Sequence, residues 1–463
     1  MGTKYVDIDT PASSIFSSFG PSLDENRPLL SRSTVTSYTT TDDHEETVID
    51  ELNPNASPFS GIFNLLNTIL GTGMLAMPAA VATVGLFPGI IFTLISGIAS
   101  GTGLYFLSES ADRVEGRRAS FFAVSQLTYP GAAVWFDTAI AIKCFGVAVS
   151  YLIIIGDIMP QVVISFDSSV PKDSILMDRR LWITAVMFGL LIPLSFKRTL
   201  DSFRHISALA ILAVVYLCAI VIYYYFFASD FPKPPPEEIE WVHLTNGILG
   251  KLPVFIFGFT CHQNLFSVHN EVKNNDRRSM IRIILSSIIT AGVFYELIAI
   301  LGYLSFGKNA RGNIILEYPV SWFVAGGRLA IVICVLFGYP LQIHPCRGSV
   351  DKILLRINGD KENKNSPFPD PPSTVKHVAM TTALLIGTYT LAITVSQLDL
   401  VLAFVGSTGS TAVSFILPGL FYFKLNENQP WTFGKTTSLI LAIFGFTVMT
   451  VCLSYNIFIL VSH

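Results

Sequence analysis

The sequence predicts an all-α membrane protein with about eleven transmembrane helices. The chain has 463 residues, of which 51% are hydrophobic and only 14% are charged, whereas a soluble protein carries about 25% charged residues. Its mean hydropathy is +0.55. The 35 phenylalanines are spread over the whole length, which indicates many membrane segments instead of one anchor on a soluble domain.

Apolar runs of about 20 residues are long enough to cross a bilayer, and they set the order of the predicted helices. The third run is long and contains Gly146, Gly156 and Pro160, so we expect a tilted or bent helix. The predicted spans are residues 60–83, 87–109, 133–165, 181–196, 203–227, 246–268, 280–306, 322–345, 376–397, 399–423 and 434–460.

The sequence predicts two parts, a tail, residues 1–57, and a transmembrane domain, residues 58–463. The tail is polar, rich in Ser and Thr and acidic near its end, a composition that predicts disorder. If the tail is cytosolic, Lys and Arg favour the inner loops over the outer loops by roughly three to one, as the positive-inside rule requires. An odd number of spans then places the C-terminus at His463 on the luminal side.

The first span carries the most informative motif, Gly71-Thr72-Gly73, near its middle. Glycine costs about 1 kcal/mol in a helix interior, so the motif predicts that the helix unwinds there. Unwound backbone at membrane depth must be buried in protein or line a cavity. The sixth span contains a similar candidate break at Gly258–His262. A five-plus-five inverted repeat would make these two helices counterparts, as in secondary transporters.

Two broken helices would expose main-chain N–H and C=O groups beside one site. Free N–H groups suit a carboxylate and free carbonyls suit an ammonium, so the pair favours an amino acid as the ligand. The alternative is that these glycines only allow close helix packing.

The segments that carry these breaks resemble one family. They are SGIFNLLNTILGTGMLAMP (60–78) and FGFTCHQN (257–264), the latter followed by Asn270-Glu271. Both resemble the amino acid/auxin permease family, and most of all the fungal vacuolar amino acid transporters (the Avt group). They are also similar to the animal sodium-coupled neutral amino acid transporters. The resemblance implies a LeuT-like fold, with a 5+5 inverted repeat plus one extra helix, that works by alternating access.

The same resemblance and the two breaks together suggest the substrate site, flanked by the third helix near residues 143–151. The predicted substrate-binding residues are Asn67, Gly71, Thr72, Gly73, Met74, Phe259, Thr260, Cys261, His262 and Gly338. No spacing of Cys or His indicates a metal or cofactor, and the net charge of −3 without a basic patch gives no indication of nucleic acid.

Protons are the favoured coupling ion. The sodium-coupled relatives use an asparagine that corresponds to Asn67 and a hydroxyl on the eighth helix, but the matching segment here, residues 335–340, has no Ser or Thr. Asn67 then serves either an ion or helix packing. Three buried ionisable residues are candidates for coupling or for substrate charge. His262 is either a proton carrier or a neutral hydrogen-bonding group. Lys143 either meets an anionic group or pairs with Asp137 or Glu296. Glu296 is either a proton site or a structural partner.

The tail contains an acidic dileucine pattern, Glu25 followed by Leu29 and Leu30. Two apolar anchors and one charge on a flexible cytosolic peptide suit a sorting adaptor, and the motif favours the vacuole or lysosome. The predicted function is secondary active amino acid transport across the vacuolar membrane. The alternatives are an amino acid sensor of that membrane and a sodium-coupled plasma-membrane transporter. No HExxH or GxSxG motif points to an enzyme.

Overall fold

The computed structural model describes residues 56–197, 206–243, 245, 247–357 and 373–462. The dileucine motif and nearly all of the predicted tail lie outside these residues. The helices before the middle of the chain are α1 (Pro58–Ile69), α2 (Gly73–Val84), α3 (Leu86–Ala111), α4 (Phe121–Thr128), α5 (Ala133–Phe166), α6 (Arg179–Val186), α7 (Ile192–Ser195) and α8 (Ile206–Phe226). The later ones are α9 (Ile248–Gly258), α10 (His262–Glu271), α11 (Arg277–Phe306), α12 (Trp322–Ile357), α14 (Thr374–Thr394), α15 (Leu398–Val405), α16 (Leu417–Leu425) and α17 (Phe433–Ser462).

The described part of the chain is an all-helical multi-pass membrane protein, as predicted. Seven of its helical segments are long and apolar enough to cross a membrane, and the bent pair α1–α2 makes an eighth. Three predicted spans, residues 181–196, 203–227 and 246–268, do not meet that test. The first and third are divided into short helices, and the described apolar part of the second, Ala210–Phe226, is short. The total of eleven spans and the 5+5 repeat therefore stay predictions.

The predicted break in the first span is confirmed. Helix α1 ends at Ile69, α2 begins at Gly73, and their axes are bent by 53°. Leu70 leaves the helical conformation with φ −72° and ψ 63°. The sixth span is interrupted as well, because α9 ends at Gly258 and α10 begins at His262, with three non-helical residues between them.

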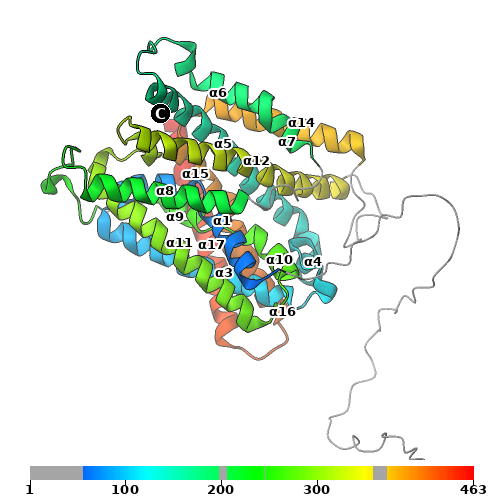
Figure 1. Ribbon diagram of the computed structural model, residues 1–463. Helices are drawn as coiled ribbons and strands as arrows, with labels where there is room; N and C mark the ends of the chain where they lie inside the picture. Colours follow the sequence, from blue (N-terminus) through cyan, green and yellow to red (C-terminus); the bar gives the residue numbers. More distant parts are fainter. Residues whose placement is uncertain (1–55, 198–205, 244, 246, 358–372, 463) are drawn as a thin grey trace, which may run out of the picture. The chain divides into compact units, whose positions relative to one another are not determined.

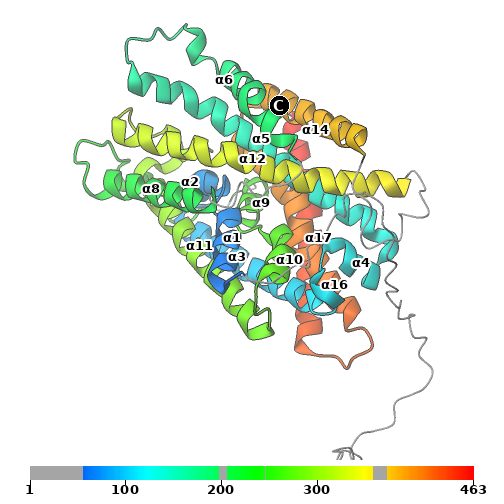
Figure 2. The ribbon, with the colours of Figure 1, turned by 45° about the vertical axis from the view of Figure 1, so that its right-hand side comes forward.

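Helices far apart in sequence lie side by side around these breaks. The long helices α5 and α12 run along each other, and α3 runs along α11 (Figures 1 and 2). In both views α1 and α9 lie between α12 and α3. The breaks are thus enclosed by protein, which is where unwound backbone is tolerated at membrane depth.

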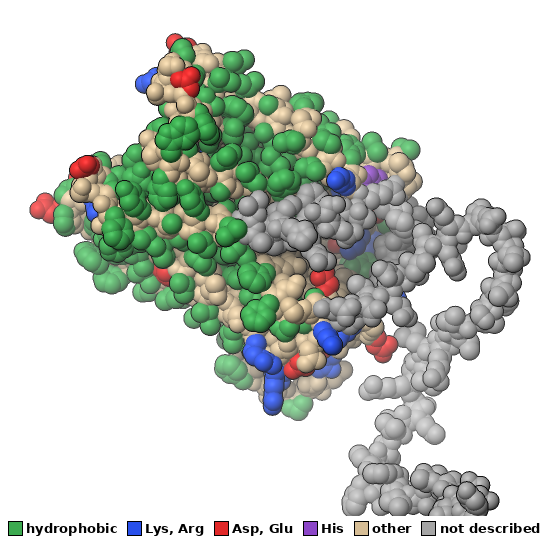
Figure 3. Space-filling view, in the orientation of Figure 1, with side chains coloured by type: hydrophobic (Ala, Val, Ile, Leu, Met, Phe, Trp, Pro, Cys, Tyr) green, Lys and Arg blue, Asp and Glu red, His purple; other side chains and the backbone are tan. Residues whose placement is uncertain are grey.

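The outer surface of the bundle suits a lipid environment. Figure 3 shows hydrophobic side chains over most of one face, with charged side chains near its ends. Exposed apolar residues recur at helical spacing on α3 and α11, including Ile91, Ile98, Ile289 and Val293. A soluble protein rarely exposes apolar patches of this extent.

Arg328, on α12, is a charged residue inside the helix bundle. Its side chain is fully buried, and its guanidinium donates hydrogen bonds to the carbonyls of Ile315 (3.2 Å) and Tyr318 (2.8 Å). Main-chain carbonyls of the segment before α12 thus compensate for the lost hydration of the charge. The interpretation of Arg328 as a structural residue is consistent with these contacts.

Candidate functional site: two helix breaks around a small cavity

At the first break, the chain turns tightly between α1 and α2. The Gly71 amide donates to the carbonyl of Ile69 at 2.7 Å, and the Leu75 amide donates to the carbonyl of Thr72 at 3.2 Å. No side chain caps the N-terminus of α2. Uncapped N–H groups and the last carbonyls of α1 therefore face this break without the partners of a continuous helix.

At the second break, the chain makes a similar turn between α9 and α10. The Thr260 amide donates to the carbonyl of Phe257 at 3.0 Å, and the Asn264 amide donates to the carbonyl of Cys261 at 3.0 Å. The N-terminus of α10 also has no side-chain cap. The two breaks thus present the same combination of helix ends.

The two breaks touch each other. A methyl group added at Gly73 would lie only 3.0 Å from the Cα of Gly258, so these glycines do serve close packing. Gly71 differs, because apart from its two chain neighbours no residue has an atom closer than 3.9 Å to where a methyl group there would lie. Packing alone therefore accounts for Gly73 and Gly258 but gives no reason for Gly71.

A small cavity lies beside both breaks. About 280 Å³ is empty between its lining atoms, but only about 10 Å³ can hold the centre of a water molecule, which is room for about one water. The space is too small for an amino acid in this conformation. Its lining residues are Thr68, Ile69, Gly71, Thr72, Lys143, Val147, Tyr151, Phe257, Thr260 and Gln342.

Of the predicted substrate-binding residues, Gly71, Thr72 and Thr260 line the cavity, as does the charge candidate Lys143. The cavity lining does not include the other predicted residues, Asn67, Gly73, Met74, Phe259, Cys261, His262 and Gly338. Gly338 packs behind the cavity wall, because a methyl group there would lie 2.9 Å from the ring of Tyr151. The prediction did not single out Thr68, Ile69, Phe257 or Gln342. Gln342 offered a signal, since it is an uncharged polar residue within an apolar span.

Lys143 is the buried charge at the cavity. It lies on α5, is 3% exposed, and forms no ion pair with a carboxylate among the described residues. The expected alternative of a pair with Asp137 or Glu296 is therefore not formed in this conformation. Both oxygens of Glu296 and one oxygen of Asp137 also lack hydrogen-bond partners in the described part of the chain. An unpaired ammonium would be costly at such a buried position.

Helix α3 holds the second break from the opposite side. The hydroxyl of Ser100 donates to the carbonyl of Phe259 at 2.7 Å. The Nε2 of His262 lies 3.1 Å from the carbonyl of Ser100, and His262 is fully buried. This contact fits the interpretation of His262 as a neutral hydrogen-bonding residue, while its Nδ1 has no partner among the described residues.

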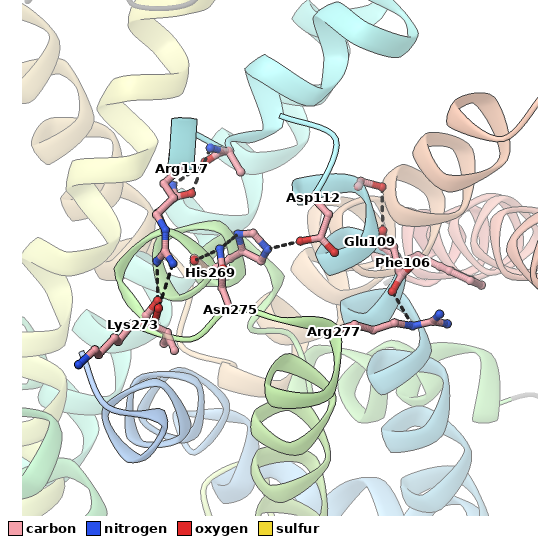
Figure 4. A network of polar contacts seen from close by, with 12 residues as sticks. Phe106, Glu109, Asp112, Arg117, His269, Lys273, Asn275 and Arg277 are labelled. Carbon is pink, nitrogen blue, oxygen red and sulfur yellow. Dashed lines mark hydrogen bonds and ion pairs between the residues drawn. The ribbon is translucent and has the colours of Figure 1, made fainter. Parts of the chain in front are cut away.

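The far end of α10 is fixed by a second polar network (Figure 4). Arg117 donates to the carbonyls of Val272 (2.6 Å) and Lys273 (2.9 Å). The imidazole of His269 lies 2.9 Å from a carboxylate oxygen of Asp112. The segment between α3 and α4 therefore holds the C-terminal end of α10 in place. This is the end of α10 that lies away from the break.

At the other end of the bundle, a more open polar pocket lies between α2, α9 and the start of α15. An ion pair between Lys251 and Asp399 crosses it. Lys308 also lines this pocket, and its hydrogen bond lowers the pKa of the Glu240 carboxyl below the usual value.

A helical membrane protein with two interrupted helices beside a small polar cavity has the architecture of a secondary transporter. A family model described as transmembrane amino acid transporter protein matches residues 54–459, and the chain belongs to this family. The resemblance noted in the sequence is thus confirmed, and the chain is a transporter and not an enzyme.

Individual relatives support the same assignment. The chain is 44% identical to "Vacuolar amino acid transporter 5" of Schizosaccharomyces pombe, over 86% of this chain and 94% of that protein. It is 36% identical to "Vacuolar amino acid transporter 6" of Saccharomyces cerevisiae, over 86% and 98%. Its identity to "Sodium-coupled neutral amino acid transporter 7" of Danio rerio is 26%, over 82% of each chain.

Proposed function

We propose that this protein is a secondary active transporter that moves amino acids across the vacuolar membrane by proton-coupled alternating access. The observation that carries the proposal is the small cavity lined by both helix breaks and by the buried Lys143. The fungal relatives named as vacuolar amino acid transporters support the substrate class and the membrane.

The helix ends at the breaks fit both ends of an amino acid. The uncapped N-termini of α2 and α10 carry partial positive charge, which suits the substrate carboxylate. The last carbonyls of α1 and α9 carry partial negative charge, which suits the ammonium. The hydroxyls of Thr72 and Thr260 line the same space and add hydrogen-bonding groups.

Alternating access requires the cavity to open, because its present free space is too small for an amino acid. The outer pocket crossed by Lys251 and Asp399 supports an approach from one side. The network that fixes the end of α10 supports closure of the other side. With the N-terminus in the cytosol and the C-terminus in the lumen, the outer pocket faces the vacuole, and the dileucine motif at Glu25, Leu29 and Leu30 is accessible to a sorting adaptor.

Protons are the proposed coupling ion because the eighth-helix segment near Gly338 has no Ser or Thr hydroxyl to bind sodium. Lys143, Glu296 and His262 are the proposed groups for coupling or for substrate charge, and Asn67 is proposed to support the first break. The lower identity to the sodium-coupled relative is consistent with this choice.

The test is uptake of radiolabelled amino acids into vesicles that contain the full chain, with imposed pH or sodium gradients. We expect flux that follows the pH gradient and is unchanged when choline replaces sodium. Flux that follows sodium and ignores pH would contradict proton coupling. Saturable binding without net flux would instead identify a sensor.

Lys143 gives a sharper test of the site. If its ammonium faces an anionic substrate side chain, Lys143→Met should reduce uptake of Asp and Glu about tenfold more than uptake of neutral amino acids, since each 1.4 kcal/mol of lost interaction is tenfold in affinity. Lys172→Met removes an exposed lysine that lines neither pocket and is the matched control. Equal loss for all substrates, or no loss, contradicts this role.

A further inference from the structure

A single hydroxyl joins the two helix breaks. Tyr295, on α11, is fully buried. Its hydroxyl lies 2.5 Å from the carbonyl oxygen of Ile69 and 2.7 Å from that of Gly258. These are the last residues of α1 and of α9, so the side chain reaches the C-terminal ends of both half-helices at once.

These two carbonyls need a positive partner. The last carbonyls of a helix have no partner within it and carry the negative end of the helix dipole. Two such ends pointing at one place repel each other, and in broken transporter helices they commonly bind a cation. In this chain the hydroxyl of Tyr295 lies between the two oxygens and can donate to either, while the Ile69 carbonyl also accepts from the Gly71 amide. Carbonyls one residue or more before these ends stay available to a substrate ammonium.

The ring of Tyr295 is held firmly in position. It packs edge-to-face against Phe259, with ring centres 5.0 Å apart and planes at 85°. It also lies against the second break, since a methyl group at Gly258 would come within 3.4 Å of the Tyr295 ring. Packing of the ring therefore fixes the position of the hydroxyl.

We propose that Tyr295 is a positioning residue of the transport site, whose hydroxyl ties the ends of α1 and α9 together and keeps both halves of the cavity in register. Ile69 is itself part of the cavity lining, so a loosened carbonyl there disturbs the substrate site directly. The inference rests on the proposed transport function and adds a residue outside the cavity lining to it.

The test compares two variants on α11. Tyr295→Phe keeps the ring and removes the hydroxyl. Tyr303→Phe is the matched control, because Tyr303 is also fully buried and its hydroxyl contacts the main-chain N and O of Glu240, at 2.9 and 3.2 Å, far from the breaks in sequence. Amino acid uptake is measured in proteoliposomes with the full chain, and KM and Vmax are normalised to folded protein.

We expect the KM of Tyr295→Phe to rise about tenfold, which is the effect of one lost hydrogen bond of about 1.4 kcal/mol. The KM of Tyr303→Phe should stay within about twofold of the unchanged protein. An unchanged KM in Tyr295→Phe, or an equal rise in both variants, overturns the proposal.

If Tyr295→Phe does not fold, Phe259→Leu loosens the ring while keeping the hydroxyl. A rise in its KM supports the proposal, and an unchanged KM overturns it. Absence of uptake by the unchanged protein would instead contradict the transport function itself.

Discussion

Two glycines on α3, only two residues apart, are expected to respond oppositely to the same substitution. A methyl group at Gly103 would lie 2.1 Å from the main-chain oxygen of Ser414 and 2.8 Å from Nε2 of His262. A methyl group at Gly101 would meet only the side chain of Ile288, at 3.8 Å, which is an ordinary contact. Comparing the stability of Gly103→Ala with that of Gly101→Ala therefore separates the effect of close packing from the effect of helix propensity.

The magnitudes follow from these distances. Alanine gains about 1 kcal/mol over glycine in a helix interior, so Gly101→Ala should stabilise the protein by up to that amount. Carbon and oxygen normally approach to about 3.3–3.6 Å, so Gly103→Ala requires the helices to separate by about 1 Å. Overpacking of this kind costs about 1–3 kcal/mol. The two variants should therefore differ in unfolding free energy by about 1–3 kcal/mol, with Gly103→Ala the less stable.

The assay is thermal unfolding of the purified full chain in detergent, followed for both variants and the unchanged protein under one condition. Uptake in vesicles is measured in parallel, because the strain at Gly103 falls on the contact that supports His262 beside the second break. If Gly103→Ala melts at or above the temperature of Gly101→Ala, the close approach of α3 to residue 414 is not as described, and the reasoning fails.

Two further predictions concern the ends of the site. Arg117 has a positive φ of 52°, which glycine adopts more readily than alanine. Arg117→Gly should therefore be about 0.5–1 kcal/mol more stable than Arg117→Ala, although both variants lose the hydrogen bonds to the end of α10. Equal melting temperatures of the two variants would contradict a strained backbone. Lys251 and Asp399 are each about a quarter exposed, so their double-mutant cycle with Lys251→Met and Asp399→Asn should give a coupling of no more than about 1 kcal/mol. A coupling above about 3 kcal/mol would show that the pair is buried more deeply.

Local composition was enough to predict where most helices lie. The predicted third span, residues 133–165, matches α5 (Ala133–Phe166) almost residue for residue, because a long apolar run has few alternatives in a membrane. The break at Gly71-Thr72-Gly73 was also visible, since glycine is costly in a helix interior. The eighth span was predicted to end at 345, but α12 continues to Ile357, because polar residues beyond the apolar run extend the helix.

Local composition did not predict which residues far apart in the sequence contact each other. Of the two alternatives for Lys143, the ion pair with Asp137 or Glu296 is not formed among the described residues, because helix rotation and packing decide which side chains meet. Gln342 lines the cavity from α12; its polarity within an apolar span was visible, but that it faces the two breaks follows only from the packing of the helices.

The sequence by itself determined the membrane class, the positions of the helices and the two places where helices come apart, because each depends on the composition of a short stretch. Only the tertiary structure decided that the two breaks touch, that one cavity lies beside both, and that Tyr295 reaches both helix ends. The physical reason is that each of these features brings together atoms from separate helices, such as Gly73 with Gly258 and Ile69 with Tyr295, and their meeting depends on how whole helices pack.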